Sequence, residues 1–380
     1  GGGVFSRNQK TITLSSEIKS FLGLKDNSLT PDQLISAILK ADVDLLWNGG
    51  IGTYIKASNE NNSEVSDKLT ESVRVDASEL RCKIIGEGGN LGITQRGRIE
   101  FALAGKKINT DAIDNAGGVD CSDHEVNIKI SMMSAVKSGH LSEKDRSKLL
   151  ESMTNNVASL VLNNNRLQTQ IITIEESLGS VQLDNHSRLL NKLSKNNFLD
   201  RKIEFLPNFK EIQRRKLENR GLIRPELAII LAYVKMGLYD NMISSPLIDD
   251  PYFEGILMNY FPERLREDFS VAIKSHTLRK EIIATELVNA VINRVGITFV
   301  NQLHEEINKD FCYIVSAFIV VRDIFDFKSI WTKIEKLDHV IPYKLQVKMF
   351  DEINRLIYQM IFRFSKLNKD FSITDSVKNF

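Results

Sequence analysis

Cysteine, net charge and long apolar runs are all scarce in this chain of 380 residues. The three cysteines, Cys82, Cys121 and Cys312, lie far apart and form no CxxC pair, which argues against a disulfide framework or a cysteine-based metal site. Such sparse cysteine favours a reducing, cytoplasmic location. The longest apolar runs, residues 227–234 and 314–321, are shorter than the roughly 18 residues that span a bilayer. A net charge of +1 provides no basic field for nucleic acid.

What is present is the composition of a globular protein, with 42% hydrophobic and 26% charged residues. The length suggests two or three domains at about 150 residues each. The chain begins with Gly1-Gly2-Gly3, without an initiator methionine or a targeting segment. We therefore expect it to be a piece of a larger protein that starts inside a loop.

Residues 1–122 alternate short apolar runs with helical segments and glycine-rich turns. The expected strands cover residues 42–47, which we expect to be buried, 80–86 and 112–114. The expected helices cover residues 32–40 and 93–104. Thr30 and Pro31 open the first of these helices, where a hydroxyl caps the helix and proline fits its first turn. This β-α-β rhythm predicts a doubly wound, Rossmann-like parallel sheet.

Strand patterns largely disappear after residue 122, and long amphipathic helices replace them. We expect a helical carboxyl-terminal domain over residues 123–380, so the predicted fold class is α/β followed by all-α. The expected helices cover residues 123–138, 143–163, 225–243, 251–259, 262–275, 278–295, 299–308, 311–325, 328–337 and 342–366. Residues 163–165, three asparagines, are expected to form a turn, and the phenylalanines after residue 310 are expected in the core.

Two predicted strands end in polar, glycine-rich turns. In residues 86–94, glycines would let the backbone approach a ligand, and Asn90 offers both a donor and an acceptor. Residues 48–53 end the other strand with Asn48, Gly49 and Gly50. Either segment alone is compatible with an ordinary turn. The carboxyl ends of parallel strands meet at one edge of a sheet, so together these turns favour a dinucleotide site.

Residues 115–125 form a third segment of this kind, with Gly117-Gly118 followed by Ser122. A helix that starts there would present free N–H groups to an anion, with Ser122 in its first turn beside a substrate carboxylate. The alternative is that Ser122 or Asp120 merely caps the helix. His124 is a lone histidine among carboxylates, with too few nitrogen or sulfur ligands for zinc, so no metal site is predicted.

At these segments the sequence resembles glutamate dehydrogenases. Glu87-Gly88-Gly89-Asn90 followed by Thr94 is similar to the family's Glu-Gly-Ala-Asn…Thr segment. Asn115-Ala116-Gly117-Gly118-Val119 with Ser122 and Glu125 is similar to its Asn-Ala-Gly-Gly-Val…Ser…Glu segment. The match is closer to the large NAD-specific enzymes of bacteria, in which segments like residues 44–53, 120–127, 224–228 and 276–285 recur almost unchanged. The chain resembles the carboxyl-terminal portion of such an enzyme. This resemblance implies that the sheet of residues 1–122 is partial and forms the carboxyl-side part of a dinucleotide-binding domain.

This resemblance implies NAD as cofactor and the oxidative deamination of L-glutamate to 2-oxoglutarate and ammonia. The residues that it implies for cofactor binding are Asn48, Gly49, Gly50, Gly88, Gly89 and Asn90. Val119 and Ser122 are the residues that it implies for substrate binding. It also implies that the full enzyme is a homo-oligomer. Nothing in the sequence indicates a nucleic-acid or membrane partner.

The family's pyrophosphate fingerprint and its catalytic lysine and aspartate are not found in this sequence. Gly86, Gly88 and Gly92 are spaced one residue too long for G-x-G-x-x-G. No catalytic residue is therefore assigned, and we expect the chain to be inactive alone and to need the amino-terminal portion of the enzyme. The alternative, from another class, is a non-catalytic helical interaction or regulatory module with a relic half dinucleotide domain.

Overall fold

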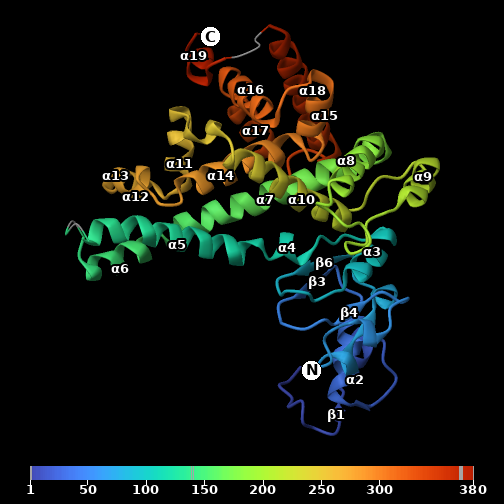
Figure 1. The fold of residues 1–380 in the computed structure, drawn as a ribbon. Coiled ribbons are helices and arrows are strands. Elements are labelled where there is room, and N and C mark those ends of the chain that lie inside the picture. The colour runs from blue at the N-terminus through green and yellow to red at the C-terminus, as the bar shows by residue number, and fades with distance from the viewer. Residues whose placement is uncertain (1, 138, 140, 368–370, 380) are drawn as a thin grey trace. The chain divides into compact units, whose positions relative to one another are not determined.

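The chain divides into two compact units in the computed structural model, which describes residues 2–137, 139, 141–367 and 371–379 (Figure 1). Unit 1 comprises Gly1–Ala116, Asp200–Asn208 and Leu222–Ile229. Unit 2 comprises Gly117–Leu199, Phe209–Gly221 and Ile230–Phe380. Each unit therefore contains segments that are distant in the sequence.

Unit 1 combines short strands with short helices. Its elements are β1 (Ile12–Thr13), α1 (Ser16–Leu22), β2 (Ser28–Leu29), α2 (Pro31–Leu39), β3 (Leu45–Asn48), β4 (Ile55–Lys56), β5 (Val75–Asp76), β6 (Ile84–Glu87), α3 (Gln95–Leu103) and α4 (Asp111–Asp114). β3 pairs with β6 and β4 with β5, both in parallel, whereas β1 and β2 are antiparallel. The prediction of parallel pairing in the first part of the chain is confirmed.

A small apolar core holds unit 1 together. It contains Ile55, Val75, Ala77, Leu80, Cys82, Ile85, Ile93, Phe101 and Ile108. The predicted start of α2 is confirmed, because the Thr30 hydroxyl accepts a hydrogen bond from the Gln33 N–H and the Gln33 side chain accepts one from the Thr30 N–H. Thr94 caps α3 in the same way, accepting from the Gly97 N–H at 3.0 Å.

Two expectations for unit 1 are wrong. Residues 112–114 were expected as a strand, but they lie in helix α4, where two aspartates occupy the first turn, the favourable end for negative charge. The chain that pairs beside β6 is instead Lys107, through a parallel bridge with Ile84. The strand over residues 42–47 was expected to be buried, but β3 leaves Leu45 and Trp47 53% and 58% exposed.

The described residues of unit 2 form helices and the loops between them. Two of these helices, α5 and α10, begin in unit 1. The helices are α5 (Ala116–Lys137), α6 (Glu143–Ser152), α7 (Thr154–Leu178), α8 (Leu183–Lys195), α9 (Phe209–Leu217), α10 (Arg224–Ile243), α11 (Glu254–Tyr260), α12 (Glu263–Asp268), α13 (Ser270–Lys274), α14 (Arg279–Val295), α15 (Phe299–Ile307), α16 (Phe311–Ile324), α17 (Phe327–Glu335), α18 (Tyr343–Leu367) and α19 (Ile373–Lys378). α16 packs against α15, α17, α18 and α19, and it is buried from Ile314 to Arg322 (Figure 1).

The helical prediction for the second part of the chain is confirmed, with four local errors. Residues 143–163, expected as one helix, form α6 and the first part of α7. α7 runs through Asn163, Asn164 and Asn165, where a turn was expected. Packing overrides the weak helix propensity of asparagine there, and the Asn164 amide donates to Asp120 Oδ2 at 2.9 Å. Residues 262–275 form α12 and α13 instead of one helix. Phe318, Phe327 and Phe350 are buried as expected, but Phe325 is exposed.

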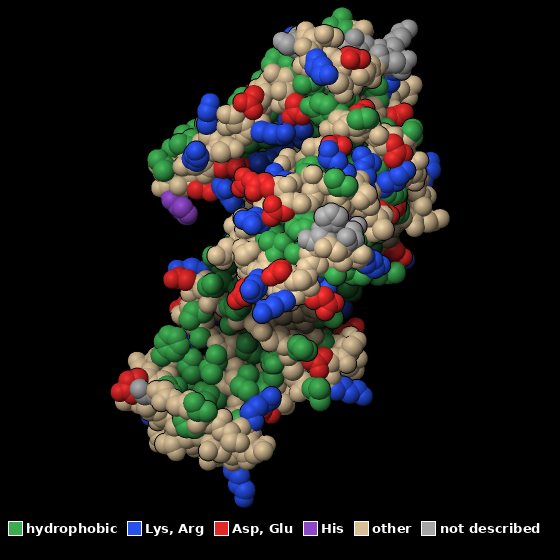
Figure 2. Space-filling view, turned by 90° about the vertical axis from the view of Figure 1, so that its left-hand side faces the viewer, with side chains coloured by type: hydrophobic (Ala, Val, Ile, Leu, Met, Phe, Trp, Pro, Cys, Tyr) green, Lys and Arg blue, Asp and Glu red, His purple; other side chains and the backbone are tan. Residues whose placement is uncertain are grey.

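Apolar side chains are also visible at the surface. Figure 2 shows several of them on the face of unit 1 that it displays. Cys82, Cys121 and Cys312 are all free. Among the described residues, no single helix has the length and apolar composition to cross a bilayer; α14 and α15 meet that test only as a pair bent by 90°.

Candidate functional site

The two predicted turns lie side by side in unit 1. In the parallel register, Trp47 is opposite Gly86 and Asn48 is opposite Glu87, so β3 and β6 end at the same edge. The backbone N–H groups of Gly88 and Gly89 both donate to the Asn48 carbonyl, at 2.8 and 2.9 Å. The structure thus brings Asn48, Gly49 and Gly50 together with Gly88, Gly89 and Asn90, the residues selected from the sequence.

The glycines of these turns are required by the packing of the chain itself. A Cβ at Gly86 or Gly88 would lie 2.6 or 2.5 Å from the Trp47 ring. At Gly89 it would lie 2.2 Å from the backbone oxygen of Gly50, so the alanine of the similar family segment does not fit this turn without movement. These contacts explain the glycines without a ligand.

Amide side chains at the turns retain free hydrogen-bonding capacity. The Asn48 Nδ2 atom is buried and has no hydrogen-bond partner among the described residues. Asn90 Oδ1 accepts from Asn115 Nδ2 at 2.6 Å, and this leaves the Asn90 amino group available. A buried donor without an acceptor is costly, because it has lost its water, so Asn48 Nδ2 is a polar atom of these turns that would gain from a partner.

Leu91 follows these turns in a strained backbone conformation. Its φ is +54°, which is uncommon for a residue other than glycine. Two hydrogen bonds hold it there: its N–H donates to Asp111 Oδ2 at 2.8 Å, and its carbonyl accepts from the Thr53 hydroxyl at 2.7 Å. Strain fixed in this way is found preferentially at binding sites.

A buried ion network lies directly beneath the Gly88–Asn90 turn. Glu87 is completely buried and accepts two hydrogen bonds from Arg98, Nε at 2.7 Å and Nη2 at 2.8 Å. Arg98 Nη2 also lies 3.1 Å from Asp111 Oδ1. Burial raises the pKa of the Glu87 carboxyl above its ordinary value, and Arg98 opposes that rise. The bidentate geometry fixes the end of β6 and so the start of the turn.

The network extends through Asp114. Its Oδ2 accepts from the Glu87 backbone N–H at 3.0 Å, and its Oδ1 accepts from Asn109 Nδ2 at 2.7 Å. Asn109 Oδ1 in turn accepts from Arg224 Nε at 2.9 Å. Sequence reasoning missed Arg98, Asp111 and Asp114 as supports of the turn. The available signal was Glu87 itself, because a carboxylate that ends a buried strand needs a cation.

The predicted substrate residues, Val119 and Ser122, lie on α5 in unit 2. Both are exposed, and their spacing of three places them on one face of the helix. α5 begins at Ala116, so Gly117 and Gly118 form its first turn and Ser122 is in the second turn, not the first as expected. The Ser122 hydroxyl donates to the Gly118 carbonyl at 3.2 Å.

His124 is a core histidine. It is 2% exposed and stacks on Tyr260 with ring centroids 4.3 Å apart. Burial lowers its pKa below the ordinary value, so the ring is neutral at pH 7 even though Asp120 lies beside it. Within the described ranges, no group of three or more His, Cys, Asp or Glu side chains is arranged to hold a metal ion.

The chain matches two family models. Residues 1–175 match "Bacterial NAD-glutamate dehydrogenase, catalytic domain", and residues 219–380 match "Glutamate dehydrogenase, C-terminal". It is 43% identical over 356 residues to the NAD-specific glutamate dehydrogenase of Pseudomonas aeruginosa, covering 94% of this chain and 22% of that protein. The enzymes named NAD-specific glutamate dehydrogenase from Halomonas elongata and Mycobacterium tuberculosis are 40% and 42% identical, over 100% and 94% of this chain. The chain spans 22–24% of the length of these relatives.

Proposed function

Because the chain belongs to the family of bacterial NAD-specific glutamate dehydrogenases, we propose that it serves the NAD-dependent oxidative deamination of L-glutamate to 2-oxoglutarate and ammonia. One observation carries this proposal beyond the family: the paired strand ends of β3 and β6 place a buried amide donor, Asn48 Nδ2, at the edge of the turns without an acceptor. A dinucleotide is rich in hydroxyl, amide and phosphate acceptors, so the residues present fit it.

In this proposal, Asn48, Gly49, Gly50, Gly88, Gly89 and Asn90 hold the nicotinamide half of NAD at the carboxyl end of a Rossmann-like sheet. NAD, when bound, supplies the hydride acceptor. Asn48 would donate its orphaned N–H to the cofactor, and Asn90 would offer its free amino group. The Glu87–Arg98 pair keeps the backbone of the turn in one position, which lowers the entropy lost on binding.

On α5, Ser122 would bind the side-chain carboxylate of glutamate and Val119 would contact its methylene groups. The Ser122 hydroxyl now donates to the Gly118 carbonyl, an exchangeable bond on an exposed face. Rotation of the hydroxyl would direct the same proton to a carboxylate oxygen. Its role is positioning, since a hydroxyl hydrogen bond orients the substrate without moving a proton in the reaction.

Proton transfer in this reaction would use residues of the long enzyme outside these 380, and the chain alone would be inactive. Two observations support this division. The relatives are about four times longer, since the chain covers 22–24% of them. β3 also leaves Leu45 and Trp47 exposed, as a parallel strand does when the layer that normally packs on its face belongs to another part of the enzyme. The amino-terminal portion of the enzyme is the proposed partner.

The remaining assignments complete the proposal. Residues 1–122 would be the carboxyl-side part of the dinucleotide-binding domain, and residues 123–380 a helical carboxyl-terminal domain. The sparse, free cysteines suit a cytoplasmic enzyme. The full enzyme would be a homo-oligomer, the commonest form of soluble protein assembly.

The test is steady-state kinetics of the full-length enzyme with Ser122→Ala. The KM for glutamate should rise about tenfold while the KM for NAD changes little, because a hydrogen bond to a charged group contributes about 1.5 kcal/mol. Ser159→Ala is the matched control, since its exposed hydroxyl also donates to a helix carbonyl four residues earlier. An unchanged KM for glutamate would remove Ser122 from the site. Glutamate-dependent NADH formation by the 380-residue chain alone would disprove its inactivity.

A further inference from the structure

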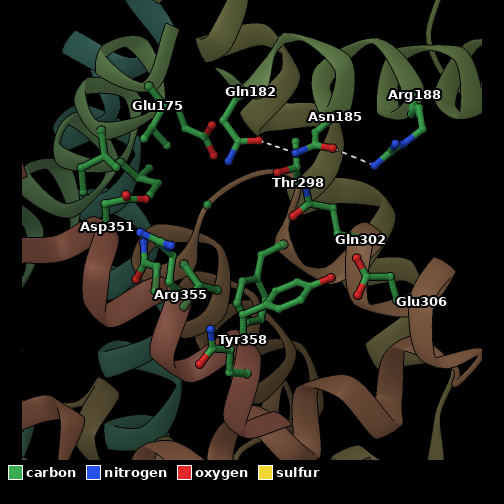
Figure 3. A pocket seen from close by; sticks show the side chains of 18 residues that line it. Glu175, Gln182, Asn185, Arg188, Thr298, Gln302, Glu306, Asp351, Arg355 and Tyr358 are labelled. Atoms are coloured by element: carbon green, nitrogen blue, oxygen red, sulfur yellow. Dashed lines mark hydrogen bonds between the residues drawn. The ribbon is translucent and has the colours of Figure 1, made fainter. Parts of the chain in front are cut away.

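A polar cavity of about 390 Å³ lies in unit 2, remote in sequence from the turns described above. Segments of α7, α8, α15 and α18 and the Gly296 loop line it (Figure 3). Its volume falls within the roughly 300–1,000 Å³ of small-molecule sites. Charged side chains of both signs face it, namely Glu175, Arg188, Glu306, Asp351 and Arg355.

Glu175 is a fixed carboxylate at one end of this cavity. It is 5% exposed, and its Oε1 accepts from the Ile297 backbone N–H at 2.8 Å while its Oε2 lies 3.0 Å from His186 Nε2. Gly296 has a φ of +102°, and a Cβ there would lie 2.5 Å from Glu175 Oε1. The loop thus presses against the carboxylate and holds it in place, so its charge is organised before any ligand arrives.

Two acceptors beside Glu175 have no donor. Asp351 and Asn354 are three residues apart on one face of α18, and both line the cavity. No hydrogen bond reaches the Asp351 carboxylate among the described residues, and Asn354 Oδ1 is buried without a partner. Burial, with Glu175 and Glu352 nearby, raises the pKa of Asp351, although Arg355 opposes the rise. An ammonium group has three N–H donors and a positive charge, which matches these acceptors.

Opposite charge is available next to them. Arg355 lies one turn beyond Asp351, and its only hydrogen bond with the described residues is from Nη1 to Glu352 Oε1 at 3.0 Å. A guanidinium has five N–H donors, so its remaining edge can pair with a carboxylate. The Arg355 side chain is 64% exposed, which places this charge at the mouth of the cavity. One end of the cavity therefore offers adjacent partners for an ammonium and a carboxylate.

Amide side chains also line the cavity, Gln182 and Asn185 around the start of α8 and Gln302 on α15. Asn185 Nδ2 donates to Gln182 Oε1 at 2.6 Å, and Arg188 Nη2 donates to Asn185 Oδ1 at 2.7 Å (Figure 3). This chain of bonds orients Gln182, whose amino group makes no hydrogen bond with the part of the chain that the structure describes. Gln302 also faces the cavity and makes no hydrogen bond with the described residues. Such amides offer both donors and acceptors, so they can pair with an uncharged amide or hydroxyl group of a ligand.

We propose that this cavity binds a polar α-amino acid, with its ammonium at Asp351, Asn354 and Glu175, its carboxylate at Arg355 and an uncharged polar side chain at Gln182 and Gln302. The site is distinct from Ser122, and the proposal does not rest on the dehydrogenase assignment. L-Glutamine is the probe that carries all three groups.

The test is isothermal titration of the 380-residue chain with L-glutamine. We expect saturable binding that weakens at least tenfold in Asp351→Asn and in Arg355→Gln. Lys348→Gln, which removes an exposed charge from the same helix outside the cavity, should bind as the unaltered chain does. Ser122→Ala should also leave binding unchanged, which separates this cavity from the substrate residues. Acetate and methylammonium, each with one of the three recognised groups, should bind much more weakly.

A second measurement keeps the proposal testable if a variant fails to fold. In the unaltered chain, L-glutamine should slow amide hydrogen exchange around Gly296 and along α18 near Asp351 and Arg355. Absence of binding at millimolar L-glutamine, or binding that survives Asp351→Asn with the same affinity, would overturn the proposal. Slowed exchange only along α5, near Ser122, would do so as well.

Discussion

The two units stabilise their interiors by different means. Unit 1 buries a charged network, Glu87, Arg98 and Asp114, beneath a small apolar core. Unit 2 buries long runs of aliphatic and aromatic residues, as on α14 and α16. Unit 1 also leaves Leu45, Trp47 and Ile84 exposed on its paired strands.

This difference indicates how far each unit completes its own interior. The helices of unit 2 pack their apolar faces against one another, and this packing needs no specific bond direction. Unit 2 therefore completes most of its own core. A parallel sheet is normally covered on both faces, but the paired strands β3 and β6 of unit 1 are partly exposed. With less apolar packing, unit 1 depends more on hydrogen bonds and ion pairs to hold its turn. We expect unit 1 to be the less stable unit in this chain.

The largest effect is expected in the core of unit 2. Phe318→Ala removes a fully buried ring that stacks on Trp331, and it should lower the free energy of unfolding by about 3–5 kcal/mol. Phe325→Ala, at the exposed end of the same helix, should cost less than about 1 kcal/mol. Each unit contains one tryptophan, Trp47 or Trp331, so denaturation followed by fluorescence can report on each. Equal losses in the two variants would contradict the apolar core.

A loss of about 3 kcal/mol is expected when the ion network of unit 1 is broken. Arg98→Met leaves Glu87 charged and unpaired in the interior, which is the costly case for a buried pair. The double variant Glu87→Met/Arg98→Met should regain most of the loss. Arg96→Met, on the same helix but in a surface pair with Glu64, should change stability by less than about 1 kcal/mol. Thermal unfolding of the four proteins gives the comparison, and a destabilised double variant would argue against it.

The smallest effect concerns acid. The pKa of Asp67 in unit 1 is lowered to about 2, first by the Thr70 hydroxyl and then by the Thr53 N–H, which both donate to it. Unfolded Asp67 has an ordinary pKa near 3.9, so between about pH 4 and pH 2 the unfolded state binds more protons. The stabilisation that Asp67 contributes is therefore fully present above pH 4 and is lost as the pH falls towards 2. Asp67→Asn should flatten this decline, and Asp26→Asn, an exposed control, should not. An unaltered acid limb would exclude Asp67 as its source.

The strand ends could be predicted because local sequence encodes them. Apolar residues that give way to Asn48-Gly49 and to Gly88-Gly89-Asn90 mark a strand that stops, and β3 and β6 do stop there. The Thr30 and Thr94 caps were likewise local patterns. The predictions of a strand over residues 112–114 and a turn over residues 163–165 were wrong. Tertiary hydrogen bonds, between Asp114 and Glu87 and between Asn164 and Asp120, outweigh secondary-structure propensities of a few tenths of a kcal/mol.

The sequence by itself determined the change from strands to helices, the glycine turns and the resemblance to a dehydrogenase family, since each is a pattern of neighbouring residues. Only the tertiary structure decided that Arg98 neutralises Glu87, that Trp47 occupies the space above Gly86 and Gly88, and that Glu175, Asp351 and Asn354 face one cavity. Those contacts join residues distant in the chain, and their energy depends on burial and geometry that no local pattern encodes.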